Sequence, residues 1–294
     1  MFNTVEEYLD ALKVEMKGSD SALMQDALAD AREHLSTALA VARESDAELN
    51  EAEALKIIVD EYGTPEETAS AYREVERRTS PSLKPTAKPR SVLSRFFGIY
   101  EDPKAWGSLL YMLISLVTGI VYFTWVVTGL SLSLSLAIFI FGLVFAIFFI
   151  FSLRGLALLE GRLVESLLGV RMPRRPLFIQ KGTTWFEGLK TNLMDKRVWL
   201  ALVYMFLQMP LGILYFTLTV TLFSLSIGLM AAPLLQLIML FPIVSFGSVQ
   251  YFLPIWSLPV FLLAGFLVWT ATMHLGKLIG TWHGRYAKWL LVSE

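Results

Sequence analysis

The stretch DPKAWGSLLYMLISLVTGIVYFT, from Asp102 to Thr124, is the most informative part of this chain because it occurs twice. Starting at Asp195, the sequence DKRVWLALVYMFLQMPLGILYFT repeats it without a gap. Tyr111–Met112 recurs as 204–205, Gly119–Ile120 as 212–213, and the triplet at 122–124 as 215–217. An identity pattern of this length predicts an internal duplication.

The composition shows what kind of unit is duplicated. Apolar residues make up 55% of the chain and charged residues 17%, which is below the usual share of about 25% in soluble domains. Residues 105–153 contain no Asp, Glu, Lys or Arg, and neither do residues 198–276. Since a membrane-spanning helix needs about 20 apolar residues, the sequence predicts an integral membrane protein with two spans in each tract.

The breaks in hydropathy place the four spans at residues 106–128, 132–153, 199–224 and 255–275. The TGLSLS sequence at 128–133 predicts a tight turn within the first pair. The second pair is separated by an uncharged, proline-marked segment, residues 226–254. This segment is either a hydrophobic loop on the outer membrane face or a re-entrant hairpin shielded by protein.

The distribution of basic residues predicts the orientation. Lys and Arg precede the first span, fill the connection between the second and third spans, and follow the fourth span, whereas neither outer loop contains any. We expect the protein in the cytoplasmic membrane. Because basic residues near span ends stay on the cytoplasmic side, both termini are expected to face the cytoplasm. The N-terminus begins a polar helix, and we expect no cleaved signal peptide.

An amphipathic segment follows each span pair: RGLALLEGRLVESLL from Arg154 and KLIGTWHGRYAKWLL from Lys277. Aligned on Gly161–Arg162 and Gly284–Arg285, both show one apolar stripe flanked by cations, which is typical of a helix lying along the inner membrane interface. We expect lipid contact and coupling at their cationic and aromatic residues. These are Arg154, Arg162, Lys277, Trp282, Arg285 and Lys288.

Each repeat is therefore expected to contain a short interfacial helix at Phe96–Phe97 or Trp185–Phe186, two spans and a second interfacial helix. The first repeat covers residues 96–170 and the second residues 184–294. Because each has an even number of spans, the two share one orientation and should be related by an axis near the membrane normal. The sequence predicts an all-α fold, a four-helix transmembrane module joined to a small N-terminal helical bundle.

Residues 154–169, with the pattern R-G-L-A-x-L-E-G-R-L-x-E-x-L-L-G after a Trp-led span pair, resemble the bacterial domain named "putative sensor". The resemblance covers roughly residues 90–294. It implies a four-span module of the kind often found in front of histidine kinases. In this sequence no kinase follows Glu294, so the output is sought in the N-terminal part.

Residues 1–79 have a different character, with 19 acidic and 8 basic residues. The sequence Thr4-Val5-Glu6-Glu7 is a capping box that opens a first helix. A second helix begins near Asp20, a third runs from about Asp46 to Tyr62, and Gly63 is suited to its C′ position. Thr64-Pro65-Glu66-Glu67 then caps a fourth helix. These signals predict a cytoplasmic bundle of four short helices.

The phrase EYGTPEETASAY, together with EEYLDALKVEM and DALADAREHLSTAL, resembles the HAAS signalling domain of the DUF1700 group. The resemblance implies a helical unit that precedes membrane spans and a cytoplasmic protein partner such as a PadR-like transcription regulator. The acidic charge argues against direct nucleic acid binding by residues 1–79 and favours a basic partner, which includes the basic 171–197 segment of the same chain. Residues 80–95, with Pro81, Pro85 and Pro89, form an extended linker.

The sequence shows no sign of catalysis. It has no cysteine, its three histidines lack metal-ligand spacing, and it contains no phosphate-binding or nucleophile motif. We therefore expect no enzymatic activity, cofactor or metal. The first hypothesis is a membrane sensor that relays a membrane or envelope signal to a cytoplasmic partner. The alternatives are an accessory or scaffold subunit of a membrane complex and, third, a transporter or lipid-handling protein.

Overall fold

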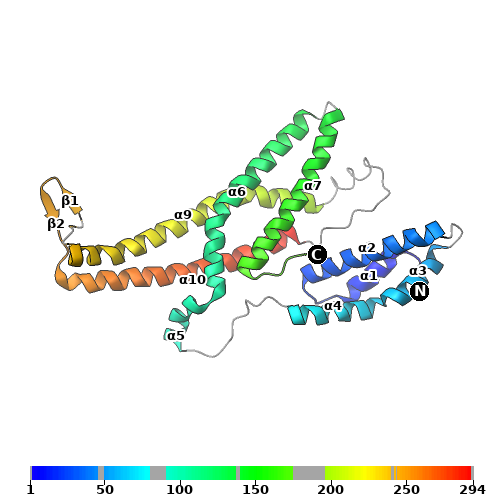
Figure 1. Ribbon diagram of the computed structural model, residues 1–294, viewed down its shortest axis with the longest axis horizontal. Helices are drawn as coiled ribbons and strands as arrows, with labels where there is room; N and C mark the ends of the chain where they lie inside the picture. The colour runs from blue at the N-terminus through cyan, green and yellow to red at the C-terminus, as the bar shows by residue number, and fades with distance from the viewer. Residues whose placement is uncertain are drawn as a thin grey trace.

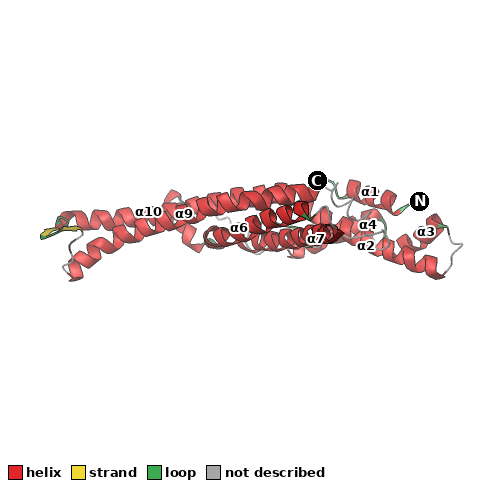
Figure 2. Ribbon diagram, turned by 90° about the horizontal axis from the view of Figure 1, so that it is seen from above, coloured by secondary structure: helices red, strands yellow, loops and turns green. Residues whose placement is uncertain are grey.

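The computed structural model describes residues 2–45, 50–79, 91–136, 140–174, 196–239, 242 and 244–292. Within these residues the fold consists of helices and one short β-hairpin. A small helical bundle is formed by the N-terminal residues, and a group of four long helices lies beside it (Figure 1). Seen from above, the molecule is long and thin, with the bundle near one end and the hairpin at the other (Figure 2).

The N-terminal bundle contains the four predicted helices: α1 (Val5–Glu15), α2 (Ser21–Ser45), α3 (Glu51–Tyr62) and α4 (Pro65–Thr79). Their apolar stripes meet in one core, which explains why a segment so rich in charge can fold. The largest fully buried side chains of this core are Tyr8, Leu12, Met16, Leu35 and Leu55.

Local capping fixes the helix boundaries of this bundle. Thr64 Oγ1 accepts a hydrogen bond from the Glu67 amide at 3.3 Å, and the Glu67 carboxylate accepts one from the Thr64 amide at 2.9 Å. This reciprocal pair is the predicted capping box. Gly63 ends α3 with a φ of 108°, a backbone conformation that suits glycine, and its carbonyl accepts the Tyr8 hydroxyl at 2.9 Å.

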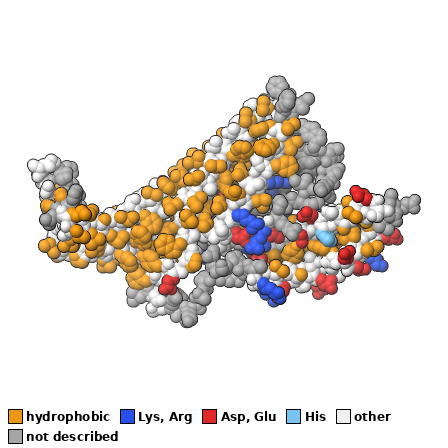
Figure 3. Space-filling model, in the orientation of Figure 1, with side chains coloured by type: hydrophobic (Ala, Val, Ile, Leu, Met, Phe, Trp, Pro, Cys, Tyr) orange, Lys and Arg blue, Asp and Glu red, His pale blue; other side chains and the backbone are white. Residues whose placement is uncertain are grey.

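Four helices are long and apolar enough to cross a membrane. A short helix α5 (Val92–Phe97) and a 3-10 turn η1 (Gly98–Glu101) lead into α6 (Pro103–Ser135). Then follow α7 (Ile140–Leu163), which continues into a π-helical turn η2 (Val164–Leu168), and α9 (Lys196–Met239) and α10 (Leu258–Leu291). Apolar side chains cover their visible face, whereas charges gather over the N-terminal bundle and the region where it meets the long helices (Figure 3).

The first predicted turn is wrong. Residues 128–133 lie inside α6, which continues to Ser135. The glycine of TGLSLS serves close packing instead of a turn, because a β-carbon at Gly129 would stand 2.0 Å from a ring atom of Phe149. The absence of a side chain at Gly129 therefore lets α6 and α7 approach each other.

The outer segment 226–254 also differs from both alternatives considered. Helix α9 continues through Pro233 to Met239, and η3 (Ile255–Ser257) leads into α10. Between them, strands β1 (Val244–Phe246) and β2 (Val249–Tyr251) pair in antiparallel fashion around Gly247. Gln236 fastens the hairpin to α9, since its amide group exchanges two hydrogen bonds of 2.8 Å with the Leu253 backbone.

The amphipathic segments differ from the expected separate helices. Residues 154–168 continue α7 and η2, and residues 277–291 continue α10 without a break. One side of each segment packs inside the group of long helices, where Val164, Leu168, Ala287 and Leu290 are buried in one core, whereas Leu159 and Trp282 of the predicted stripes remain exposed.

Helices α6 and α9 cross at two glycines that hold equivalent places in the repeated phrase. A β-carbon on Gly119 would lie 2.6 Å from the Gln208 carbonyl oxygen, and one on Gly212 would lie 2.2 Å from the Ser115 carbonyl oxygen. The contact is reciprocal, as in a two-fold interface. Gly107 and Ser108, which also belong to the first copy of the repeated phrase, pack elsewhere, against Leu167 and Gly280.

Some predictions fall on residues that the structure does not describe. The aromatic pair Trp185–Phe186 and most of the basic segment 171–197 lie outside the described residues, as do residues 80–90 of the linker. Of the predicted entry helices, the one at Phe96–Phe97 is observed as α5. His274 holds it in place, because its Nε2 lies 3.0 Å from the Phe96 carbonyl oxygen and its ring stacks on the Phe96 ring.

Candidate functional site

A carboxyl group is buried among the four long helices. Glu160 near the end of α7 is fully buried, and three tyrosine hydroxyls donate to it. Tyr111 of α6 and Tyr204 of α9 reach Oε1 at 2.5 and 2.7 Å, and Tyr122 of α6 reaches Oε2 at 2.9 Å. A buried carboxyl group in a membrane protein is costly unless it is paired, so these three hydroxyls are what makes its burial tolerable.

A histidine faces the same tyrosines from α10. His283 is also fully buried, and its Nε2 lies 2.6 Å from the Tyr111 hydroxyl and 3.0 Å from the Tyr204 hydroxyl. Its Nδ1 lies 3.2 Å from the hydroxyl of Tyr215 in α9. The two central tyrosines thus bridge Glu160 and His283.

One arrangement of protons satisfies these contacts. Tyr111 and Tyr204 each have a single O–H, and both donate it to Glu160. His283 Nε2 must then carry a hydrogen and donate to their oxygens, and Nδ1 accepts from Tyr215. The carboxyl group acts only as an acceptor in this arrangement, and the hydrogen bonds run in one direction from Tyr215 to Glu160.

The network has room for further hydrogen bonds at its edge. Gln208 Nε2 donates to the Tyr111 hydroxyl at 2.9 Å, and Gln208 Oε1 has no hydrogen-bond partner among the described residues. The hydroxyl of Tyr286, which stacks on Tyr204 with ring centroids 5.5 Å apart, is likewise without one in this part of the chain. Buried polar atoms of this kind are rare in folded proteins and often mark functional places.

The members of this network occupy matching positions in the sequence. Tyr111 and Tyr204 are 93 residues apart, as are Tyr122 and Tyr215 in the repeated phrase. Glu160 and His283 both precede the Gly-Arg pair on which the amphipathic segments align. The alignment of the two segments predicts the apolar stripe, and it also places a carboxyl group opposite an imidazole, but the repeat alone gives no reason to single out these two residues.

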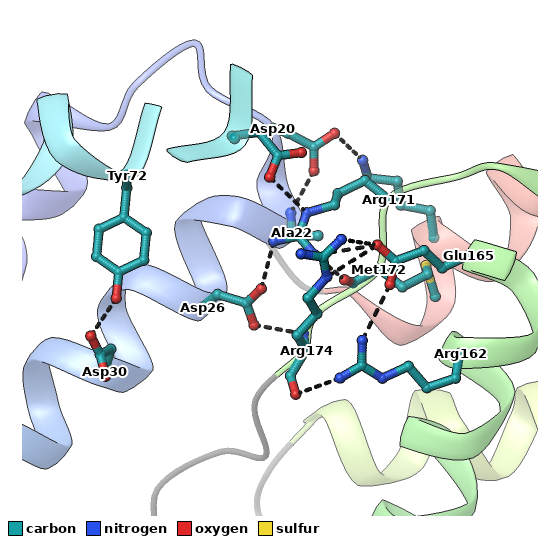
Figure 4. Close-up of polar contacts among 12 residues, drawn as sticks. Asp20, Ala22, Asp26, Asp30, Tyr72, Arg162, Glu165, Arg171, Met172 and Arg174 are labelled. Carbon is teal, nitrogen blue, oxygen red and sulfur yellow. Dashed lines mark hydrogen bonds and ion pairs between the residues drawn. The ribbon is translucent and has the colours of Figure 1, made fainter. Parts of the chain in front are cut away.

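A second cluster joins the long helices to the N-terminal bundle, and we call it the charged seam (Figure 4). Arg171, which follows η2, is 9% exposed and pairs with Asp26 of α2 at 2.9 Å and with Glu76 of α4 at 3.3 Å. It also lies 3.4 Å from Glu165 of η2. A buried arginine with three carboxylates around it fixes the position of the bundle against the end of α7.

Two further contacts extend the seam. Arg174 donates its backbone amide to Asp26 at 2.7 Å and its guanidinium to Glu165 at 2.9 Å, and this Glu165 contact raises the pKa of Arg174 above its ordinary value. On the other side, Lys288 of α10 lies 2.5 Å from Asp20. Asp20 and Asp26 thus bind residues that follow both span pairs.

The structure distributes the six predicted coupling residues over several places. Arg162 pairs with Glu165 one turn on at 3.4 Å, and Lys277 pairs with Asp102 at 2.6 Å. Trp282 is exposed and stacks on Tyr286, Arg285 is exposed, and Arg154 lines a cavity. Of the six, Arg162 and Lys288 contact members of the seam; lipid contact by this set stays a prediction.

The described residues contain no group of three or more His, Cys, Asp or Glu side chains placed to hold a metal ion. In the polar network a carboxyl group and an imidazole both contact tyrosine hydroxyls, and these hydrogen bonds connect the four long helices.

Four long apolar helices around a buried polar network define a multi-span membrane protein. A family described as "Putative sensor" matches residues 111–291, which is more than half of the chain, and the protein belongs to this family. The match confirms the resemblance of the membrane part. No curated protein and no solved structure shows significant similarity to the chain.

Proposed function

We propose that this protein is a membrane sensor that passes a change in its four-helix unit to its N-terminal helical bundle. The observation that supports the proposal best is the charged seam, where buried Arg171 joins Glu165 of η2 to Asp26 of α2. Membership of a sensor family supports the same role. The signal is a membrane or envelope change, and the relay requires no chemical reaction.

The physical path is short. Glu160 of the polar network and Glu165 of the seam lie in one continuous helical segment, five residues apart. A π-helical turn, Val164–Leu168, begins between them, and such turns are frequent at functional sites because they interrupt regular helix packing. A shift of α7 that rearranges the tyrosines around Glu160 would therefore move Glu165 and, through it, Arg171 and α2.

The finer parts of this proposal rest on the sequence. We propose that the two halves are copies related by a pseudo-two-fold axis, which the reciprocal Gly119 and Gly212 contacts support. We also propose that residues 1–79 are a HAAS-like signalling domain whose output is binding of a cytoplasmic protein, such as a PadR-like regulator. The orientation of both termini toward the cytoplasm belongs to the same proposal.

Hydrogen exchange of the full chain in nanodiscs tests the relay. The substitution Glu160→Gln weakens the polar network, and we expect it to change exchange in residues 20–31 of α2 although it lies in α7. In an Arg171→Gln background the seam is already broken, so adding Glu160→Gln should produce no further change there. This loss of additivity is the sign of energetic coupling between two sites.

The control background is Arg162→Gln, which removes a nearby arginine that pairs with Glu165 but does not contact α2 in any described interaction. In this background the response of α2 to Glu160→Gln should persist. If Glu160→Gln leaves exchange in residues 20–31 unchanged, or if its effect is the same in the Arg171→Gln background, the relay is refuted and the seam is a static contact.

A further inference from the structure

A cavity of about 280 Å³ lies where α7, α9, the end of α10 and α2 come together. Its wall is mainly apolar and is supplied by both parts of the molecule. The apolar lining includes Phe151, Leu158, Met172, Val198, Ala201 and Leu291. Three polar side chains complete it: Arg154 of α7, Arg197 of α9 and Gln25 of α2.

We propose that this cavity binds one acyl chain of an anionic phospholipid that carries a headgroup hydroxyl, as phosphatidylglycerol does. The lipid would be the ligand of the proposed sensor, and only this role as a signal rests on the proposed function. The chemistry of the cavity wall is the argument for lipid binding.

The apolar wall of the cavity is suited to binding an acyl chain. Side chains from the long helices α7, α9 and α10 enclose most of the space. Phe151 and Gly155 of α7 are exposed on the outside of these long helices. An acyl chain can therefore enter from the membrane without crossing water. The volume of about 280 Å³ lies just below the range for drug-sized ligand sites, about 300–1,000 Å³, so it has room for one acyl chain and not for two.

The two arginines account for the anionic head. Arg154 and Arg197 line the cavity, and a guanidinium group has five N–H donors, so each can hold a phosphate oxygen in addition to the contacts that it already makes. Both flank long uncharged tracts, at the level where the basic residues of the chain predict the inner membrane surface. A phosphate at this depth would belong to a lipid of the inner leaflet.

The side chain of Gln25 is the reason for proposing a hydroxyl group in the lipid headgroup. Its Oε1 atom is buried against the cavity and has no hydrogen-bond partner among the described residues. A carboxylate or a fully ionised phosphate has no proton to donate to this acceptor, whereas a headgroup hydroxyl has one. Because Gln25 belongs to α2 and neighbours Asp26 of the seam, a lipid in the cavity would contact the bundle and the long helices at once.

Native mass spectrometry of the purified full chain tests the assignment by counting retained lipids. The protein is incubated with phosphatidylglycerol, phosphatidic acid or phosphatidylcholine. We expect retention of one phosphatidylglycerol, at least about tenfold better than phosphatidylcholine. Gly155→Leu places a side chain in the cavity, where a β-carbon meets nothing within 4 Å, and should lower retention at least about tenfold, the equivalent of about two buried methylene groups.

Matched variants control each step. Gly228→Leu introduces the same residue in α9, also in open space but away from the cavity, and should retain lipid like the unchanged protein. Arg154→Gln with Arg197→Gln should abolish the preference for phosphatidylglycerol, whereas Arg162→Gln with Arg285→Gln, which removes the same charge outside the cavity, should not. Gln25→Leu should remove the preference for phosphatidylglycerol over phosphatidic acid.

Three results would overturn the assignment: equal retention of phosphatidylcholine, unchanged retention by Gly155→Leu, or loss of retention by Gly228→Leu as well. The last result would show that lipid is held by the general surface of the helices. None of these results depends on hydrogen exchange in α2. A failed lipid assignment therefore leaves the relay standing, and a failed relay leaves the lipid site standing.

Discussion

At the residue scale, the effect of removing a group from the polar network depends on how many hydrogen-bond partners that group has. Tyr111 and Tyr204 contact both Glu160 and His283, whereas the described hydrogen bond of Tyr122 goes to Glu160. Removing the carboxyl group therefore affects the tyrosines unequally. Removing one tyrosine hydroxyl leaves Glu160 with two donors.

This difference predicts the order of stability losses. Glu160→Ala should lower the free energy of unfolding by about 3–5 kcal/mol, the range for breaking a buried polar or ionic network. Tyr122→Phe should lower it by about 1 kcal/mol, because the carboxyl group keeps Tyr111 and Tyr204. Denaturant unfolding of the full chain in detergent micelles measures both. Equal losses would contradict the assignment of Glu160 as the common acceptor.

The residues of this network show where sequence reasoning fails. Tyr111 and Tyr204 are visible as a repeat, but their partners come from other segments that differ in chemistry between the copies, Glu160 in one and His283 in the other. A search for repeats finds positions where the two copies have the same residue, whereas this site combines a carboxyl group from one copy with an imidazole from the other. By contrast, the Thr64 and Glu67 capping box was predictable because all its atoms lie within four residues.

At the element scale, glycines have two opposite roles in the long helices. Gly119 and Gly212 let α6 and α9 cross closely, whereas Gly228 of α9 faces open space. The apolar length of each span was predictable, but its end was not. Gly129 was interpreted as a turn residue when it is a packing residue, and Pro233 did not end α9, so both boundaries were predicted too early.

These roles predict opposite effects of the same substitution. Gly119→Ala and Gly212→Ala place a β-carbon less than 3 Å from a backbone carbonyl oxygen, and overpacking of this kind costs about 1–3 kcal/mol. Gly228→Ala should instead stabilise the protein by about 0.5–1 kcal/mol, because alanine favours the helix and nothing opposes it. Thermal unfolding in micelles distinguishes them. Similar effects at all three positions would exclude a close crossing of α6 and α9.

At the scale of the whole molecule, the charged seam constrains the arrangement of the chain about the membrane. Arg171 and Lys288, which follow the second and fourth predicted spans, contact Asp26 of α2 and Asp20 directly before it. The N-terminal bundle and the ends of both repeats therefore lie on one side. Helix α9 has 44 residues and is about 66 Å long, more than twice the hydrocarbon thickness of about 30 Å, so it must tilt or project from the membrane.

The hairpin β1–β2 lies at the far end of α9 and α10 from the bundle (Figure 1). With the positive residues inside, the hairpin is expected on the outer side. The chain has no cysteine, so single cysteines can be introduced on an otherwise unreactive background. An impermeant thiol reagent should label Ser248→Cys, an exposed position in the hairpin turn, in intact cells.

Two matched positions complete this experiment. Ser45→Cys at the end of α2 and Ser166→Cys in η2 are both exposed, and both should react only after the cells are opened. Ser166 is the sharper test, because the seam requires η2 to lie on the same side as the bundle. Labelling of Ser166→Cys in intact cells would separate η2 from α2 across the membrane, and neither the ion pairs of Arg171 nor a relay through them could then exist.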